Sequence, residues 1–209
     1  MSTRDDIVFV VDDDFRLREA LHELLTSAGI DAVTFGSAAE FLGYSKPDVP
    51  ACLILDVDLP DTNGLDLQSQ LVPDDHPPIV FITGHGDIPS SVRALKGGAV
   101  DFLTKPFSES ELLGAVETAI AQDREARRKR CEIGALQQRL STLTPREREV
   151  LPLVVSGLLN KQAAAELGIS EVTLQIHRGR IMHKMEAQSL AELVRMAGTL
   201  AIPITNARR

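Results

Sequence analysis

Short apolar runs, each followed directly by a polar side chain, constrain the first half of this chain most strongly. The runs are rich in β-branched residues and show no polar alternation, which indicates strands buried on both faces. Strands of this kind lie parallel, with helices between them. The runs are Ile7–Val11, Cys52–Leu55, Ile79–Ile82 and Val100–Leu103. We therefore expect a doubly wound, parallel α/β sheet.

The polar residues after these runs carry the chemistry. They are Asp12 and Asp13, Asp56, Thr83 and Lys105, and they converge because the carboxyl ends of parallel strands form one ligand crevice. Clustered carboxylates raise one another's pKa unless a cation lies among them, and Mg²⁺ prefers such oxygen ligands. The absence of neighbouring His or Cys argues against zinc. The pattern predicts a magnesium site at which an Asp56 oxygen attacks an activated phosphoryl group.

The order and spacing of these residues closely resemble the receiver domain of bacterial two-component response regulators. The resemblance covers roughly residues 5 to 122, through Val11–Asp13, Leu55–Asp56, Leu59–Pro60 with Gly64, Thr83–Gly84 and Lys105–Pro106. It implies a flavodoxin-like sheet of five parallel strands. It also implies these roles: Asp56 as phosphoacceptor; Asp12, Asp13, Asp56 and the backbone carbonyl of Asp58 as Mg²⁺ ligands; Lys105 as phosphoryl contact; Thr83 as switch hydroxyl; and Phe102 at the aromatic switch position.

The second half contains closely spaced helix signals. Thr144 and Glu147 form a capping box, with Pro145 at the first helical position, for a helix that we expect to end at Val155. Two short helices joined by a tight turn at Gly168 then predict a helix-turn-helix, whose second helix enters the DNA major groove. The expected N-caps are Asn160 for Lys161–Leu167, Ser170 for a helix through Met185, and Ser189 for a fourth helix.

This half resembles the four-helix LuxR-type effector domain, and the whole chain is similar to FixJ-type regulators. The matching residues are Leu143–Leu151, Asn160, Lys161, Ala164, Leu167–Ser170, Thr173, His177, Ile181 and Lys184. One departure is Gly179, in the middle of the recognition helix, where Gly costs about 1 kcal/mol relative to Ala. Family members often present a longer side chain there, so the target sequence does not transfer to this chain.

Candidate DNA contacts follow from helical periodicity. Leu174, Ile181 and Met185 share an inward stripe. An exposed Ile176 is unusual in solvent but fits a thymine methyl group, and Gln175 can read adenine. We expect Arg178, Arg180 and Lys184 to contact phosphates, and Lys161, Gln162 and Thr173 to contact the DNA backbone. The full set of candidates is Lys161, Gln162, Thr173, Gln175, Ile176, Arg178, Gly179, Arg180 and Lys184.

Charge divides the chain at a similar place. Residues 1 to 122 carry 7 Lys or Arg and 21 Asp or Glu, and residues 123 to 209 carry 15 and 9. An acidic half joined to a basic half indicates a cation site in one and a polyanion partner for the other. We expect a receiver at 1–122, a helical linker at 123–140 and the DNA-binding domain at 141–209.

Two questions about the linker stay open. It is either one continuous helix or two helices with a break near Gly134. Its basic run from Arg124 to Arg130 either binds DNA or forms a solvated face whose charges pair with nearby acidic residues.

The patterns together predict a transcription factor, not an enzyme, that a partner sensor histidine kinase phosphorylates on Asp56. Phosphorylation then controls homodimerisation and promoter binding, with RNA polymerase as a further partner. No signal peptide or membrane span is visible, so we expect a cytoplasmic protein without membrane contact. Alternatives remain: a phosphorylation-independent DNA-binding or interaction module, an acidic loop at Asp12–Asp14, and a purely structural Phe102. A haloacid-dehalogenase-like phosphatase is disfavoured, because Pro60 stands where its threonine is expected.

Overall fold

The computed structural model describes residues 6–71, 76–84 and 88–203. The chain divides into two compact units, Met1–Arg127 and Arg128–Arg209. Each unit is described by itself below. None of the helices in the described part of the chain combines the length and the hydropathy that a membrane span requires.

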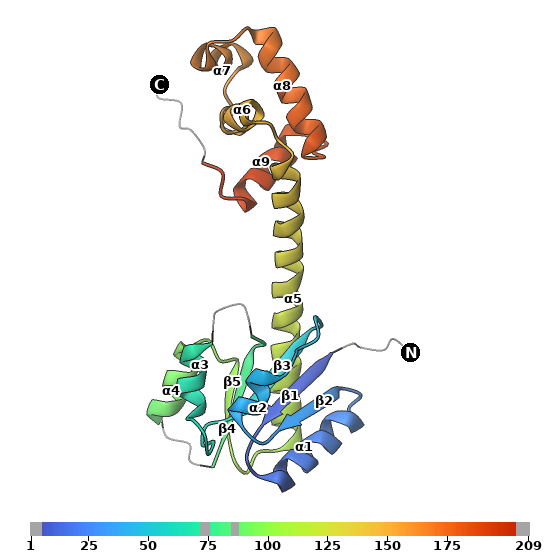
Figure 1. The fold of residues 1–209 in the computed structure, drawn as a ribbon, viewed down its shortest axis with the longest axis vertical. Helices are drawn as coiled ribbons and strands as arrows, with labels where there is room; N and C mark the ends of the chain where they lie inside the picture. Colours follow the sequence, from blue (N-terminus) through green and yellow to red (C-terminus); the bar gives the residue numbers. More distant parts are fainter. Residues whose placement is uncertain (1–5, 72–75, 85–87, 204–209) are drawn as a thin grey trace. The chain divides into compact units, whose positions relative to one another are not determined.

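The first unit is built on a five-stranded, all-parallel sheet with strand order β2-β1-β3-β4-β5 (Figure 1). The predicted doubly wound sheet is therefore confirmed. The strands are β1 Ile7–Val11, β2 Asp31–Phe35, β3 Ala51–Asp56, β4 Ile79–Thr83 and β5 Asp101–Thr104. The prediction for the last strand was wrong in two respects. Strand β5 begins after Val100, and its side chains are half-buried or, for Thr104, exposed, because β5 lies at the edge of the sheet.

Helices cover both faces of the sheet. Helices α2, α3 and α4 pack on the face formed by Phe9, Leu55 and Phe81, and α1 and α5 pack on the face formed by Val10 and Ile82. Alternation of side chains along each strand produces these two apolar layers. The helices are α1 Phe15–Ser27, α2 Ala38–Gly43, α3 Gly64–Gln70, α4 Ile88–Lys96 and α5 Glu109–Ser141.

Helix α5 is a single helix that continues past Gly134. Ser108 and Glu111 cap its start reciprocally. A helical stripe of Leu112, Val116, Ala119 and Ile120 is buried against the sheet. Of the two alternatives for the linker, the continuous helix is the one observed.

Charged contacts attach α5 to the beginnings of two strands. The buried carboxylate of Asp123 accepts the backbone N–H of Ala51, the first residue of β3, at 2.8 Å, and Nε of Arg127 donates to the same carboxylate at 2.7 Å. Arg124 pairs with Asp6, which precedes β1, at 2.7 Å. The first residues of the expected linker are thus joined to the sheet unit by contacts that are distant in sequence.

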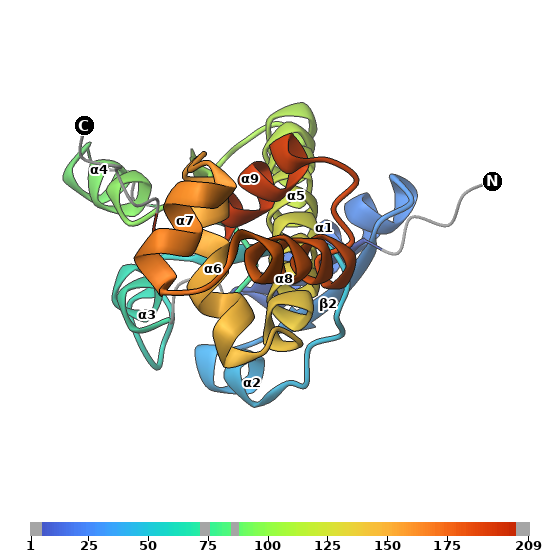
Figure 2. The same cartoon turned by 90° about the horizontal axis from the view of Figure 1, so that it is seen from above.

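The second unit is all-helical, with α6 Pro145–Val155, α7 Asn160–Leu167, α8 Glu171–Lys184 and α9 Leu190–Thr199 (Figure 2). The capping box of Thr144 is confirmed, as are the N-caps Ser170 and Ser189. Gly168 closes α7 with φ of 63°, a left-handed conformation that Gly adopts without strain. Asn160 was wrongly predicted as an N-cap: Leu159 occupies that position, and its N–H donates to Oε1 of Gln162 at 3.0 Å.

Helix α8 packs against both α6 and α7, and α9 packs against α6. The predicted inward stripe of α8 is confirmed, because Leu174, Ile181 and Met185 are fully buried. The helix ends one residue earlier than expected, with Met185 as its C-cap. This packing holds α8 with its opposite face toward solvent.

Candidate functional site

The carboxyl ends of β1 and β3 bring three aspartates together. Asp12 follows β1 directly, and Asp56 is the last residue of β3. Carboxylate oxygens of Asp12, Asp13 and Asp56 all lie within 4.8 Å of one another. Asp12 and Asp56 are buried, whereas Asp13 is exposed. The cluster lies where the strand order reverses direction, which is the ligand-binding edge of such sheets.

Lys105 lies between the two buried carboxylates. Its Nζ donates to Oδ2 of Asp12 at 2.7 Å and to Oδ2 of Asp56 at 2.6 Å. Burial raises the pKa of Asp12 to about 6, although the hydrogen bond from Lys105 opposes the shift. Burial alone would lower the pKa of Lys105, but its hydrogen bonds with Asp12 and Asp56 raise the pKa above the usual value. One ammonium therefore only partly neutralises three carboxylates.

The donor set fits a hard divalent cation. All three clustered side chains offer carboxylate oxygens, the ligands that Mg²⁺ prefers. The N–H of Asp58 donates to Oδ1 of Asp56 at 3.0 Å, which places the backbone of Asp58 beside the cluster. The side chain of Asp58 is exposed and is not one of the three clustered carboxylates. A cation bound here would offset the repulsion among the three carboxylates that the single charge of Lys105 does not cancel.

Gly64 allows the chain to pass close behind Asp56. A Cβ atom built on Gly64 would lie 2.3 Å from the backbone oxygen of Asp56, closer than real contacts allow. The N–H of Gly64 donates to the carbonyl of Val57 at 2.8 Å. The loop between β3 and α3 is thereby held tightly around the end of the strand.

Thr83 and Phe102 lie on neighbouring strands. Thr83 is fully buried at the end of β4 and pairs in register with Thr104 of β5. Phe102 is half-buried and pairs in register with Phe81, with their ring centroids 6.2 Å apart. Side chains two apart on a strand share a face, so Thr83 and Phe102 lie on the same side of the sheet. Residues 85–87, between β4 and α4, lie outside the described residues.

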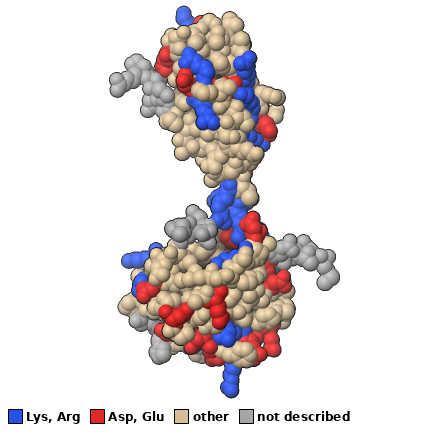
Figure 3. Space-filling view, in the orientation of Figure 1, with Lys and Arg blue, Asp and Glu red and all other residues tan. Residues whose placement is uncertain are grey.

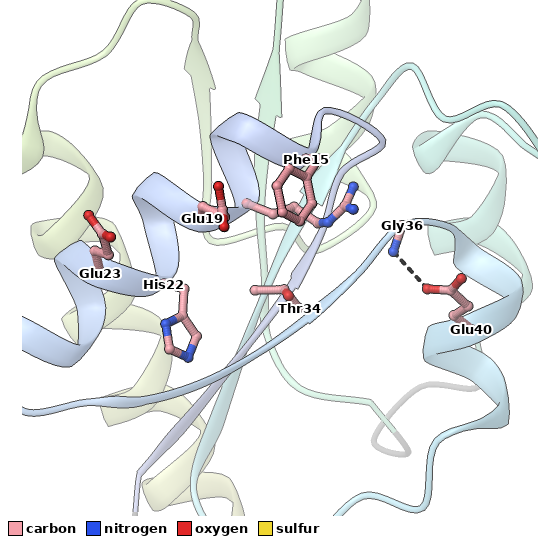
Figure 4. Close-up of a pocket in the computed structure, with 8 residues that line it drawn as sticks. Phe15, Glu19, His22, Glu23, Thr34, Gly36 and Glu40 are labelled. Atoms are coloured by element: carbon pink, nitrogen blue, oxygen red, sulfur yellow. Dashed lines mark hydrogen bonds between the residues drawn. The ribbon is translucent and has the colours of Figure 1, made fainter.

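A shallow cavity of about 270 Å³ borders the start of α1 (Figure 4). Phe15, the first residue of α1, is 60% exposed, and the guanidinium of Arg18 lies 5.6 Å from its ring centroid. Arg18 also donates to the backbone carbonyl of Asp12 at 2.6 Å. The remaining lining residues are Glu19, His22, Glu23, Thr34, Gly36 and Glu40. Sequence patterns did not identify this surface, because an apolar residue at a helix start is usually assigned to the core.

The second unit has a different surface charge. On the face drawn in Figure 3, Lys and Arg side chains gather over this unit, whereas acidic side chains are frequent over the sheet unit. Six of the candidate DNA contacts are exposed: Lys161, Gln162, Gln175, Ile176, Gly179 and Arg180. Three are half-buried: Thr173, Arg178 and Lys184. The Arg178 guanidinium donates to Oδ1 of Asn160 at 3.2 Å, and Oγ1 of Thr173 lies 2.8 Å from Oγ of Ser170.

Lys184, which we expect on DNA phosphates, also has partners within its own unit. Its ammonium donates to the buried Glu147 carboxylate at 2.7 Å and to the carbonyl of Thr142 at 3.1 Å. Burial alone would raise the pKa of Glu147, but the hydrogen bonds from Lys184 and Thr144 lower it below the usual value. Lys184 therefore ties the end of α8 to the start of α6, and its phosphate contact stays a prediction.

Two family models match this chain over separate, successive regions. Residues 8–117 match the response regulator receiver domain, and residues 141–197 match the bacterial regulatory proteins of the luxR family. The chain therefore belongs to the two-component response regulators that carry a receiver and a LuxR-type DNA-binding domain. This family consists of transcriptional regulators rather than enzymes, and its two domains imply a kinase partner and promoter DNA.

Similar proteins extend over nearly the whole chain. Nodulation protein W of Bradyrhizobium diazoefficiens is 54% identical over 197 residues, covering 94% of this chain and 87% of that protein. Transcriptional regulatory protein FixJ of the same organism is 40% identical over 198 residues, covering 94% and 96%. The solved structure of the response regulator StyR is 48% identical, with a TM-score of 0.81, covering 92% of this chain and 98% of that chain.

Proposed function

We propose that Asp56 is the phosphoacceptor and that a sensor histidine kinase is the phosphoryl donor. The observation that carries this assignment is the position of Lys105, whose ammonium contacts both Asp12 and Asp56 at the carboxyl edge of the sheet. A fixed cation at that place can face the oxygens of an incoming phosphoryl group. Asp56 lies at the end of a buried strand, so its carboxylate has a defined position.

The chemistry is a phosphoryl transfer between two side chains. An Asp56 oxygen attacks phosphorus, the P–N bond of the kinase phosphohistidine breaks, and its electron pair remains on the imidazole nitrogen. Asp12, Asp13, Asp56 and the backbone carbonyl of Asp58 would hold Mg²⁺, which would supply positive charge to neutralise the phosphoryl oxygens. Lys105 contacts the phosphoryl oxygens from the side of β5.

The surface at the start of α1 suits the approach of the kinase. Asp56 is buried, so a donor must contact the residues around it. Phe15 offers an exposed ring there, and Arg18 links the same turn to the backbone of Asp12. The cavity beside Phe15 contains both charged and apolar groups, as expected for a transient protein contact (Figure 4).

Phosphorylation would then be transmitted through Thr83 and Phe102 to α4. The phosphoryl group adds close to two negative charges, which draw the Thr83 hydroxyl and Lys105 inward and let Phe102 turn into the space left. Helix α4 exposes three large apolar side chains at i, i+4 and i+7, namely Ile88, Val92 and Leu95. An exposed apolar stripe of this kind fits a homodimer interface formed by α4 and β5.

The dimer would place two copies of α8 on promoter DNA. Helix α8 follows the turn at Gly168 and occupies the recognition position of the helix-turn-helix. The candidate contacts are Lys161, Gln162, Thr173, Gln175, Ile176, Arg178, Gly179, Arg180 and Lys184. The regulator would act in the cytoplasm, where the promoter and RNA polymerase are.

Acetyl phosphate, a small donor that needs no kinase, tests the phosphoacceptor directly. Intact-mass measurement should show one added phosphoryl group in the presence of Mg²⁺, and none after chelation or in Asp56→Asn. Asp66→Asn, which changes an exposed acid of α3, is the matched control and should be labelled normally. Labelling that persists in Asp56→Asn or ignores the chelator would contradict the assignment. DNA binding that is identical with and without phosphorylation would favour the phosphorylation-independent alternative.

A further inference from the structure

The solvent face of α8 carries two aliphatic side chains. Val172 is 69% exposed and Ile176 is 51% exposed. Residues four apart on a helix lie on the same face, so these two side chains are neighbours. They point away from the buried stripe of Leu174 and Ile181. Nothing within the unit covers them among the described residues, yet each leaves much apolar area in water.

The surroundings of this pair favour DNA over a protein partner. Arg178 and Arg180 follow Ile176 on the same helix, Lys161 is exposed on α7, and Glu171 is the one acid within α8. A basic helix with an apolar centre suits the major groove, where phosphates line both edges and the thymine C5-methyl group is the apolar element of the floor. Val172 and Ile176 also lie in the N-terminal half of α8, the part of a recognition helix that reaches base edges.

We propose that Val172 and Ile176 together read thymine methyl groups and so determine which promoters this regulator selects. The inference rests on the proposed entry of α8 into the major groove. It adds Val172 to the candidate DNA contacts, and it names the thymine methyl group as the part of the DNA that both side chains contact. The two side chains are separated by about 6 Å along the helix axis, which reaches thymines about two base-pair steps apart.

Deoxyuridine supplies the test, because it differs from thymidine only by the missing methyl group. Full-length protein, treated with acetyl phosphate and Mg²⁺, is used to select binding sites from random double-stranded DNA. Each thymine of the selected site is then replaced by uracil in turn, and affinity is measured at one salt concentration. We expect a loss of about fourfold per contacted methyl group at one or two thymines in each half-site.

The protein variants identify the reading side chains. Val172→Ala and Ile176→Ala should each lose sensitivity to uracil at one thymine, so that the variant binds the thymine and uracil forms of the selected site equally. Val172→Ile should retain that sensitivity. Leu42→Ala, which removes a side chain that is 51% exposed on α2 of the sheet unit, is the matched control and should behave as wild type. Because the variant side chains are exposed, these changes spare the core.

The outcomes separate the inference from the proposed function. Selected sites with no uracil-sensitive thymine, or a sensitivity that survives both alanine variants, would overturn methyl reading while leaving DNA binding intact. Failure to select any site, with phosphorylation of Asp56 verified by mass, would overturn the recognition role of α8 and the inference with it. Loss of uracil sensitivity in the alanine variants alone would support the assignment.

Discussion

The ammonium of Lys184 lies 2.7 Å from the Glu147 carboxylate, at the junction between the last turn of α8 and the first turn of α6. Glu147 is buried and also completes the N-terminal capping box of α6. One carboxylate therefore fixes both the start of α6 and the end of the recognition helix. The second unit is therefore held together by the Lys184–Glu147 ion pair in addition to its apolar core.

Lys184→Ala should destabilise the second unit by about 2–4 kcal/mol, because a buried carboxylate loses its charged partner. Amide hydrogen exchange of α6 and α8, followed by mass spectrometry, measures the effect locally. Lys161→Ala removes the charge of an exposed lysine and is the matched control. Equal protection in the two variants would contradict a structural role for Lys184.

Arg180→Ala should weaken DNA binding without loss of stability. Its exposed guanidinium is a candidate phosphate contact, so the slope of log affinity against log salt should become shallower by about one unit. Titrations on one selected promoter and on random DNA at several salt concentrations measure this slope. An unchanged slope, with affinity equal to wild type, would place Arg180 outside the interface.

Acid should weaken the second unit through Glu147. Its pKa in the folded state lies below the usual value, so ionised Glu147 stabilises the fold above the unfolded pKa of about 4.3. That contribution is lost as the pH falls through the folded pKa. Urea unfolding midpoints, followed by helical circular dichroism, should decrease less with acid in Glu147→Gln than in wild type. Parallel decreases in both proteins would show that other carboxylates dominate.

Phe15→Ala should affect phosphorylation by the kinase but not phosphorylation by acetyl phosphate. If the kinase contacts the α1 surface, the variant loses phosphotransfer from the kinase, by about tenfold for an aromatic anchor, but accepts acetyl phosphate at the wild-type rate. Phe15 is exposed, so the fold is retained. Radiolabel transfer from the phosphorylated kinase, compared with intact mass after acetyl phosphate, distinguishes the cases. Equal losses with both donors would indicate damage to the acidic pocket instead.

Thr83→Ala should accept the phosphoryl group and yet lose most phosphorylation-dependent dimerisation. The Thr83 hydroxyl is the group expected to move toward the phosphoryl oxygens, and its loss uncouples Phe102 and α4. Sedimentation velocity of phosphorylated wild type and variant measures the dimer. Val92→Asp, which places a charge on the exposed stripe of α4, should abolish dimerisation by a separate route. Normal dimerisation of Thr83→Ala would make Thr83 a strand-end hydroxyl without a switching role.

The sheet and its acidic edge were predictable because each relevant residue follows its own apolar run. Asp12 and Asp56 need no long-range information once their strands are recognised as parallel. Asp123 gave no such signal, because a single acid in a charged helix does not reveal that it will meet the N–H of Ala51. The partner of Lys184 was unpredictable for a related reason: the start of α6 reaches this side chain from a distant part of the chain.

The position of Asp56 depends on the absence of a side chain at Gly64 as well as on the residues that contact Asp56. The residue contributes no polar side chain and touches no ligand, but any Cβ there would displace the backbone oxygen of Asp56. A substitution at this position therefore acts on Asp56 through the main chain. Sequence surveys that consider only the charged residues of the acidic edge would overlook this position, where a single methyl group is enough to displace the Asp56 backbone.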